Sequence, residues 1–289
     1  MTYEVNKLAK GEHPPLLAEI PEPPTELWSA VMLPPPELKL LAVVGSRKNT
    51  HYGREACEYL IAGLKDYPIG IVSGLALGID GIAHQAALRA GLYTCAIPGS
   101  GLDPAVLHPR SHYQLAERIV QSGGGLLSEY APDFPAALWT FPQRNRIMAG
   151  MSHATLLIEA NEKSGTLITA RLASDYNRDL LVVPGSIFSP SSRGTHQFMK
   201  LGATPATTPE DVLIALGFEM NAEESAQEEF DFSGLSPEEV KIIEILSEPR
   251  DRETLIGELE LPISTANILL MKMELAGLIV DSPGGIRRA

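Results

Sequence analysis

Five basic residues stand at three short turns of the chain, and their chemistry is that of anion binding. Arg47 and Lys48 occupy one turn, Arg144 and Arg146 a second, and Lys163 a third. Each turn precedes a segment with helical periodicity, so backbone N–H groups and the positive end of a helix dipole reinforce the side-chain charge. A single charged turn is usually only solvated. Three such turns favour a site for phosphate or a similar anion.

The first of these turns ends a clearly patterned unit. An apolar run over 38–44 leads into Gly45, Ser46 and Arg47, and a helical pattern begins after Thr50. This order predicts a buried strand, a tight turn and a helix. Similar strand-like runs and helical patterns then alternate along the chain, the strands over 69–73, 94–97, 126–128, 154–159 and 180–183, and the helices over 53–65, 79–90, 111–121, 145–150 and 164–176. The alternation predicts an α/β fold with a doubly wound, mostly parallel sheet, which binds ligands at the carboxyl ends of its strands.

Small residues recur where the predicted strands end. They include Gly45-Ser46, Ser73-Gly74, Pro98-Gly99-Ser100, Ser164-Gly165-Thr166 and Pro184-Gly185-Ser186. Glycine and serine let a backbone approach a ligand closely. One glycine-rich turn is a weak sign, because a tight turn needs glycine for its own dihedral angles. Several turns at the same edge of a sheet strengthen the prediction of a binding site there.

Common signatures of catalysis do not occur in the sequence. Lys163-Ser164 lacks the glycine spacing of a P-loop, and the turn at Gly45 lacks the Gly-x-Gly-x-x-Gly spacing of dinucleotide sites. His108 and His112 are four residues apart, but no glutamate follows the first as a zinc protease requires. No serine lies in a recognisable triad motif. The sequence therefore indicates no metal and no cofactor, and NTP hydrolysis and redox chemistry lack their usual signatures.

Composition divides the 289 residues into four parts. Residues 1–37 hold eight prolines and predict an extended lead-in, and the strand–helix alternation fills 38–218. The composition of residues 219–233 predicts an acidic linker. The helical patterns and final apolar run of residues 234–289 predict a small winged-helix domain of three helices and a hairpin. The net charge is −13, but Lys and Arg balance Asp and Glu over 41–218, whereas 219–289 hold 16 acidic and 6 basic residues. A local basic patch on the larger domain is compatible with this distribution.

The sequence indicates neither a membrane nor an oxidising compartment. No apolar run approaches the roughly 18 residues of a membrane span, and residues 1–7 lack the apolar core of a signal peptide. The two cysteines, Cys57 and Cys95, fall in segments predicted to be buried. We therefore expect a cytoplasmic protein without disulfide bonds.

Several motifs together resemble the DNA-processing protein A (DprA, also Smf) family. The likeness runs from about His13 to Phe218 and is carried, in the family's order, by Val43-Val44-Gly45-Ser46-Arg47, Val72–Asp80 with Ala83-His84, Phe141–Ile147, Glu159-Ala160 with Lys163–Ala170, and Val183–Ser186. The resemblance implies an extended Rossmann-type domain that binds single-stranded DNA without covalent chemistry. It further implies a homodimer that loads the RecA recombinase onto incoming DNA during competence and natural transformation.

The resemblance also implies which residues contact the DNA. The expected basic pocket consists of Gly45, Ser46, Arg47, Arg144, Asn145, Arg146, Lys163, Ser164, Gly165 and Thr166. Backbone amides and cations in such a pocket hold phosphates without reading the base sequence. Phe141 is a candidate for stacking on a base, although packing in the core explains it equally well. The winged-helix domain is acidic, with Lys272 the only cation on its expected recognition helix, which favours a protein contact or a regulatory role.

The chain departs from the family at three places. Residues 1–37 are too short for the helical N-terminal domain of many relatives, His196 stands where asparagine is common, and Gln143 replaces a frequent arginine. Ordinary core packing or a dimer interface explains the apolar residues near the end of the larger domain, which are Phe198, Met199, Leu213 and Leu216.

Two other functions remain open at this point. One is a nucleotide-processing enzyme like the lysine-decarboxylase-like phosphoribohydrolases, whose fold is related. That family has Pro-Gly-Gly-x-Gly-Thr before a catalytic glutamate, whereas this chain has Pro98-Gly99-Ser100-Gly101 and a separate Ser164-Gly165-Thr166. The other is that the winged-helix domain carries the function and the larger domain is a scaffold.

Overall fold

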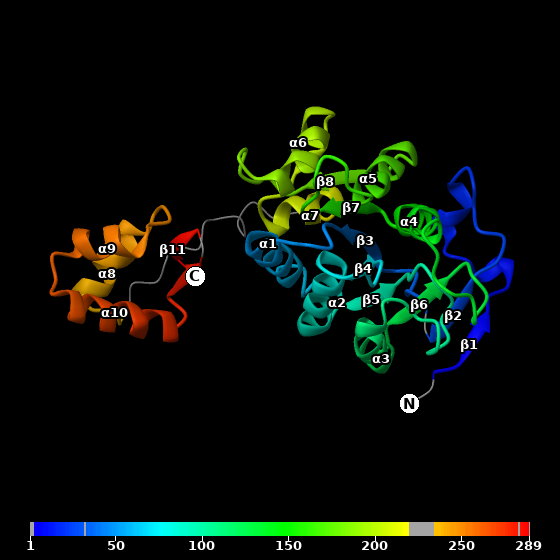
Figure 1. The fold of residues 1–289 in the computed structure, drawn as a ribbon, viewed down its shortest axis with the longest axis horizontal. Helices are drawn as coiled ribbons and strands as arrows, with labels where there is room; N and C mark the ends of the chain where they lie inside the picture. The colour runs from blue at the N-terminus through cyan, green and yellow to red at the C-terminus, as the bar shows by residue number, and fades with distance from the viewer. Residues whose placement is uncertain (1–2, 32, 220–233, 283, 289) are drawn as a thin grey trace. The chain divides into compact units, whose positions relative to one another are not determined.

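The structure is a computed structural model that describes residues 3–31, 33–219, 234–282 and 284–288 (Figure 1). It divides into a larger unit, residues 1–220, and a smaller unit, residues 221–289. Apart from Glu219, the predicted acidic linker 219–233 lies outside the described residues.

One sheet runs through the larger unit and has nine strands within the described residues. Their order across the sheet is β1 (Val5–Lys7), β2 (Trp28–Val31), β6 (Gly125–Ser128), β5 (Tyr93–Ala96), β4 (Ile69–Ser73), β3 (Lys39–Val44), β7 (Ala154–Leu157), β8 (Asp179–Val182) and β9 (Thr204–Pro205). All neighbours from β6 to β9 are parallel, and β1 and β2 are antiparallel to their neighbours. The predicted doubly wound, mostly parallel sheet is confirmed.

Helices cover both faces of this sheet, because both faces of its central strands are apolar. Along β3, Leu41 and Val43 face one core, while Leu40 and Val44 face the other. The helices of the larger unit are α1 (His51–Ala62), α2 (Ile79–Ala90), α3 (Tyr113–Gln121), α4 (Thr140–Met151), α5 (Thr166–Asp175), α6 (Arg193–Lys200) and α7 (Pro209–Ala215). Residues of α1, α2 and α7 fill the first core, and residues of α4, α5 and α6 fill the second. Short 3-10 turns lie at 10–12, 15–19, 110–112 and 190–192.

The proline-rich segment 1–37 does more than lead into the domain, because it extends the sheet. Trp28 pairs with Ser128 of β6, and β1 pairs with the outer side of β2. Leu17 and Leu27 are fully buried. Five of the eight prolines fall between these two strands and three follow β2. The strands themselves are too short to produce a clear periodic pattern. The described residues of this segment belong to the larger unit.

Core packing accounts for most of the apolar residues that could also have formed a dimer interface. Phe198, Leu213 and Leu216 are buried in the two cores of the larger unit, and Met199 packs against one of them. Phe198 and Met199 belong to α6 and Leu213 to α7, and Leu216 directly follows α7. As dimer contacts, the three buried residues are therefore excluded.

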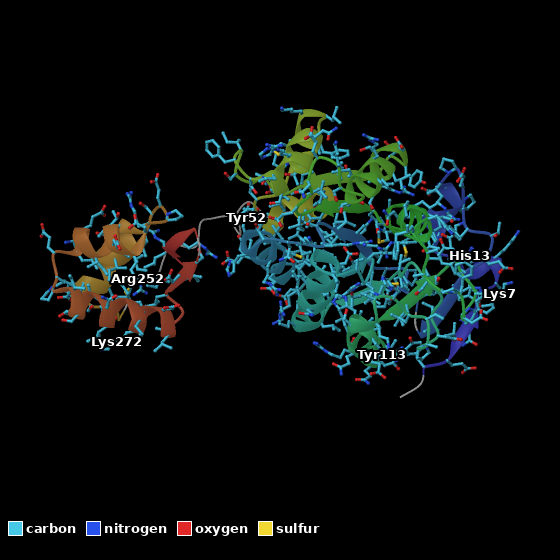
Figure 2. All side chains as sticks on the ribbon, viewed as in Figure 1. Lys7, His13, Tyr52, Tyr113, Arg252 and Lys272 are labelled. Atoms are coloured by element: carbon cyan, nitrogen blue, oxygen red, sulfur yellow. The ribbon has the colours of Figure 1, made fainter. Side chains whose placement is uncertain are left out.

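The smaller unit is built from three helices and a hairpin, as predicted. They are α8 (Pro237–Ile245), α9 (Arg252–Leu259), α10 (Ile263–Leu275), β10 (Ile279–Ser282) and β11 (Gly285–Arg288). Ser236 caps α8 by accepting from the Glu239 backbone N–H at 3.3 Å, and the Glu239 carboxylate accepts from the Ser236 N–H at 2.7 Å. Lys272 is exposed on α10 (Figure 2). This arrangement is that of a winged helix.

Candidate functional site

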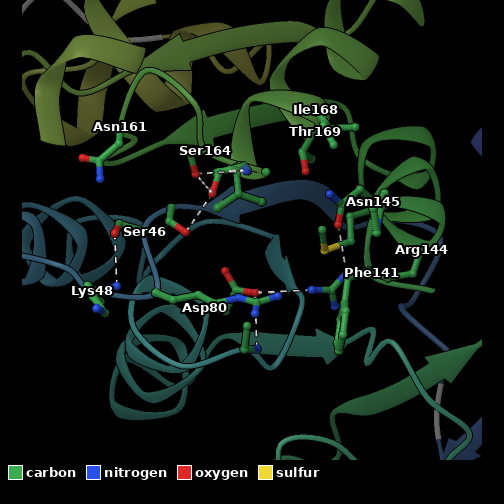
Figure 3. Close-up of a pocket in the computed structure, with 18 of the residues that line it drawn as sticks. Ser46, Lys48, Asp80, Phe141, Arg144, Asn145, Asn161, Ser164, Ile168 and Thr169 are labelled. Atoms are coloured by element: carbon green, nitrogen blue, oxygen red, sulfur yellow. Dashed lines mark hydrogen bonds and ion pairs between the residues drawn. The ribbon is translucent and has the colours of Figure 1, made fainter. Parts of the chain in front are cut away.

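A cavity lies where the strand order of the sheet reverses. From β3 the chain proceeds to β4, β5 and β6 on one side, and then returns to β7 and β8 on the other. The turns after β3 and β7 therefore diverge and leave a crevice between them. The cavity has a volume of about 520 Å³ and is lined by these turns, the turn after β4, and the first turns of α4 and α5 (Figure 3).

Most of the predicted binding residues line this cavity. They are Gly45, Ser46, Arg47, Phe141, Arg144, Asn145, Ser164, Gly165 and Thr166. Lys163 is an exposed residue directly before the lining Ser164. Arg146 does not line the cavity. Leu138, Asn161 and Ile168 also line the cavity, and no recognisable sequence signal distinguished them.

The turn after β3 is held between the first turns of two helices. The Ile79 N–H at the start of α2 donates to the Ser46 carbonyl at 3.2 Å, and the Thr166 hydroxyl at the start of α5 donates to the Gly45 carbonyl at 3.1 Å. A Cβ on Gly45 would lie 2.5 Å from the Ile79 side chain. Gly78 has φ +78°, which favours glycine. Close packing therefore dictates these two glycines.

The turn before α5 is fixed by its own hydroxyl groups. Ser164 Oγ accepts from the Thr166 N–H at 3.2 Å and donates to the Thr166 hydroxyl oxygen at 3.0 Å (Figure 3). Gly165 precedes the helix with φ −59°, and a Cβ placed there would meet no protein atom within 4 Å. Packing therefore does not require glycine at 165, and the space beside this helix start is open to a ligand.

Arg144 lines the cavity but directs its donors into the protein. It is 4% exposed, and its guanidinium donates to the Gly74 carbonyl at 2.5 Å, to the Ile97 carbonyl, and to Asn145 Oδ1 at 3.0 Å. Its Nη2 lies 3.7 Å from Asp80 Oδ2. Burial raises the pKa of Asp80, while the Arg144 charge acts to lower it. Arg144 therefore ties together the ends of β4 and β5. It lies in the wall of the cavity as predicted, but its donors are engaged within the protein.

Arg146 does not contribute to the cavity. Its guanidinium pairs with the Glu129 carboxylate, and both side chains are mostly buried. Burial raises the pKa of Glu129, against the effect of Arg146. Residues two apart on a helix do not share a face, so α4 turns Arg146 away from the side that carries Arg144. The prediction that Arg146 lies in the basic pocket is therefore wrong.

Asp80 and His84, one turn apart on α2, have separate partners. Asp80 pairs with Arg144, while His84 Nδ1 lies 2.8 Å from the Thr94 hydroxyl. That hydroxyl donates to the Ile71 carbonyl at 3.1 Å, so it accepts from His84. Although they are four residues apart on one helix, Asp80 and His84 do not pair with each other. Both side chains instead stabilise the sheet beneath the cavity.

The exposed charge of the cavity belongs to the turn after β3. The Arg47 guanidinium lies 5.1 Å from the centre of the Phe141 ring, and the His108 ring contacts the same phenyl group at 5.4 Å. Phe141 is half-buried, and a Cβ on Gly99 would lie 2.6 Å from it. Phe141 is thus part packing residue and part support for Arg47.

Within the described residues, no group of three or more His, Cys, Asp or Glu side chains is placed to hold a metal ion. Cys57 and Cys95 are free, buried thiols. None of the described helices has the length and apolar character needed to cross a membrane.

Comparison with known proteins assigns both units to one family. Residues 5–217 match the family described as DNA recombination-mediator protein A, and residues 226–285 match the DprA winged helix domain. Protein Smf of Escherichia coli (strain K12) is 38% identical over 260 residues, which cover 86% of this chain and 68% of that protein. DNA processing protein DprA of Streptococcus pneumoniae is 39% identical over 202 residues, covering 70% of each chain.

Two solved structures share the fold of the larger unit. The X-ray structure of DprA from Streptococcus pneumoniae superposes with a TM-score of 0.69 at 36% identity, covering 75% of this chain and 76% of that one. A Helicobacter pylori structure, which concerns the single-stranded DNA binding mode of DNA processing protein A, gives a TM-score of 0.65 at 27% identity, covering 74% and 96%. The chain belongs to the DNA recombination-mediator protein A family.

Proposed function

We propose that this protein binds single-stranded DNA in the cavity at the carboxyl edge of the sheet. The observation that carries the proposal is an open cavity with Arg47 and Lys48 in its wall and Lys163 beside it, in a chain of net charge −13. Family membership supports the same ligand, as does the single-stranded DNA binding mode described for the Helicobacter pylori relative.

The shape of the cavity suits unpaired nucleotides. Its volume of about 520 Å³ is that of a small-ligand site, which accommodates a few nucleotides but not a duplex. Arg47, Lys48 and Lys163 supply phosphate contacts, and the amides at the start of α5 add hydrogen-bond donors. Such contacts hold the backbone without reading sequence, so binding is tolerant of sequence and sensitive to salt.

We further propose the role of a recombination mediator, in which a cytoplasmic homodimer delivers the strand to RecA during natural transformation. This role follows from the family resemblance. Phe198, Leu213 and Leu216 are buried and cannot form a dimer surface. Two large apolar side chains near them are exposed at the ends of α6 and α7, Leu201 and Ile214. We propose these two as dimer contacts. Sedimentation of the Leu201→Glu/Ile214→Glu variant tests this surface, and an unchanged mass would exclude it.

A non-enzymatic role fits the carboxylate of the cavity better than catalysis does. Asp80 is buried and paired with Arg144, which is a structural arrangement. Incubation with nucleoside monophosphates distinguishes the phosphoribohydrolase alternative, because release of free base would establish an enzyme. We expect the nucleotides to remain intact.

For the winged-helix unit we propose a protein contact. Its third helix, α10, exposes Ile268, Met271 and Leu275 at helical spacing, a surface poorly suited to phosphates. Deletion of residues 219–289 is expected to leave DNA affinity unchanged. A large loss of affinity would instead make the winged helix the DNA-binding unit.

The proposed function is tested by fluorescence anisotropy with labelled oligo(dT) and the corresponding duplex at two salt concentrations. We expect binding of the single strand that weakens as salt rises, and much weaker binding of the duplex. Equal affinity for both forms, or no binding of either at low salt, would overturn the proposal.

A further inference from the structure

We propose that Trp139 is a stacking platform for a base of the bound strand, just outside the cavity. The inference rests on the proposed function and extends the site along the sheet edge, towards the end of β6. At this position the indole contacts the flat face of a base. That contact is chemically distinct from the phosphate contacts of Arg47 and Lys163.

Trp139 is held in place yet remains largely open to solvent. Its ring centre lies 5.8 Å from that of Tyr130 and 5.9 Å from that of Phe134, with interplanar angles of 83° and 73°. Despite these edge contacts, the residue is 55% exposed. Tryptophan buries more apolar area than almost any other side chain and is enriched at interfaces. An indole fixed on one side and exposed on the other is suited to stack on a flat ligand.

The segment that carries Trp139 is anchored to the turn after β5. The Gly101 N–H donates to the Phe134 carbonyl at 2.8 Å, and the Asp103 N–H donates to the Pro132 carbonyl at 2.9 Å. Thr140, directly after Trp139, is fully buried and donates its hydroxyl to the Gly99 carbonyl at 2.5 Å. Because the loop is already ordered, little conformational entropy is lost when a base stacks there.

The platform is continuous with the cavity. Leu138, the residue before Trp139, lines the cavity and is 91% exposed, and Phe141 lines it two residues later. A strand that leaves the cavity past Leu138 therefore meets the indole next. Single-strand binders combine a charged groove with aromatic side chains on which successive bases stack.

Electrostatics near Trp139 favour a base over a phosphate. Arg146, seven residues later in the chain, is paired with Glu129 and mostly buried, while Asp133 of the loop that carries Trp139 is exposed and acidic. A phosphate would gain little here. The contribution of Trp139 to affinity is therefore expected to be insensitive to salt, in contrast with that of Arg47.

The Trp139→Ala variant tests the inference by fluorescence anisotropy with oligo(dT) over a series of salt concentrations. Stacking on one base is worth about a five- to hundredfold change in affinity, so we expect a loss of this size with an unchanged salt slope. Trp139→Phe keeps an aromatic ring and should retain most of the affinity. Tyr59→Ala is the matched control, because Tyr59 on α1 is 56% exposed and lies outside the cavity lining.

Intrinsic fluorescence gives a second readout, because the chain has only two tryptophans, Trp28 and Trp139. Oligo(dT) should quench the emission of the wild type and of Trp28→Phe, but not that of Trp139→Phe. Wild-type affinity in Trp139→Ala, or quenching that persists in Trp139→Phe, would overturn the stacking role. If Arg47→Glu loses binding while Trp139→Ala does not, only this inference fails. If wild type itself does not bind oligo(dT), the proposed function fails as well.

Discussion

The guanidinium of Arg47 lies over the ring of Phe141, 5.1 Å from its centre. The ring is supported from beneath by the turn at Gly99 and flanked by His108. An exposed cation–π contact contributes only about 0.5–1 kcal/mol to stability. Its consequence here is geometric, because it holds an exposed cation at the mouth of the cavity rather than leaving it mobile in solvent.

Replacement of Phe141 should therefore affect binding more than folding. Phe141→Leu keeps most of the packing volume and should cost under about 1.5 kcal/mol of unfolding free energy. Loss of the aromatic face releases Arg47, so oligo(dT) affinity should fall, while Phe141→Tyr should remain close to wild type. Urea unfolding and anisotropy measure the two effects. Equal affinity in the Leu and Tyr variants would show that the ring does not position Arg47.

Arg144 is predicted to be a residue of the fold. Arg144→Met leaves Asp80 buried without its cation, and removal of one partner of a buried pair costs about 3–5 kcal/mol. Burial already raises the pKa of Asp80, and removal of the arginine raises that pKa further.

Because the pKa of Asp80 is raised in the folded state, the stability of Arg144→Met should depend on pH. A carboxyl group whose pKa is higher in the folded state stabilises the fold at low pH, and this stability is lost as pH rises through the folded pKa. Arg144→Met should therefore lose less unfolding free energy, relative to wild type, in acid than at neutral pH. Adding Asp80→Asn to the same chain should remove this difference between the two pH values. Urea titrations across pH measure it, and a deficit independent of pH would contradict the account.

His84 should make the protein less stable in acid. Burial lowers its pKa from 6.5 to about 3, so between these values the unfolded chain binds a proton that the folded chain does not. Stability contributed by neutral His84 is thus present above pH 6.5 and falls as pH decreases towards about 3. His84→Asn should flatten this part of the stability profile. A profile as steep as that of wild type would assign the acid sensitivity to other groups.

Lys163 and Arg146 provide a direct contrast between an exposed and a buried cation. Each phosphate contact contributes about 0.7 to the slope of log affinity against log salt for a single strand. Lys163→Gln should reduce the slope by about that amount, because its charge is exposed beside the cavity. Arg146→Gln should lower stability, since Glu129 loses its partner, but leave the slope unchanged. A reduced salt slope in Arg146→Gln would show that Arg146 contacts a phosphate after all.

Substitution of Gly165 should affect stability and DNA affinity in opposite directions. A Cβ there meets no protein atom within 4 Å, and φ is −59°, so Gly165→Ala should stabilise the protein by about 0.4–1 kcal/mol. The same methyl group occupies space needed by a phosphate at the start of α5, so affinity should fall. Thermal unfolding and anisotropy check both signs. Higher affinity together with higher stability would exclude a close phosphate at this position.

Much of the fold could be predicted because local patterns agree with it. The strands and helices from β3 to α5 lie close to their expected positions, and the cap at Ser236 starts α8 as its spacing indicates. β1, β2 and β9 could not be predicted, since they have two to four residues and depend on pairing with distant strands. The four-residue strands β5 to β8 were predictable because each is part of a strand–helix alternation, and β1, β2 and β9 have no such context.

The turns that form the site were predictable, but the directions of its arginines were not. The sequence pattern placed the start of the fourth helix near residue 145, whereas α4 begins at Thr140. A turn lets Arg144 and Arg146 point to the same side, and a helix separates them. The buried partners Asp80, Glu129 and Gly74 come from distant segments, so only the tertiary structure reveals that both cations are engaged.

In the proposed function, exposed cations at this cavity bind the backbone of single-stranded DNA. The most direct test compares oligo(dT) binding by wild type, Arg47→Glu and Lys65→Glu, the last making the same charge change on a lysine outside the cavity lining. We predict that Arg47→Glu loses binding at a salt concentration where wild type and Lys65→Glu bind equally well. Equal affinity of all three proteins would contradict the claim.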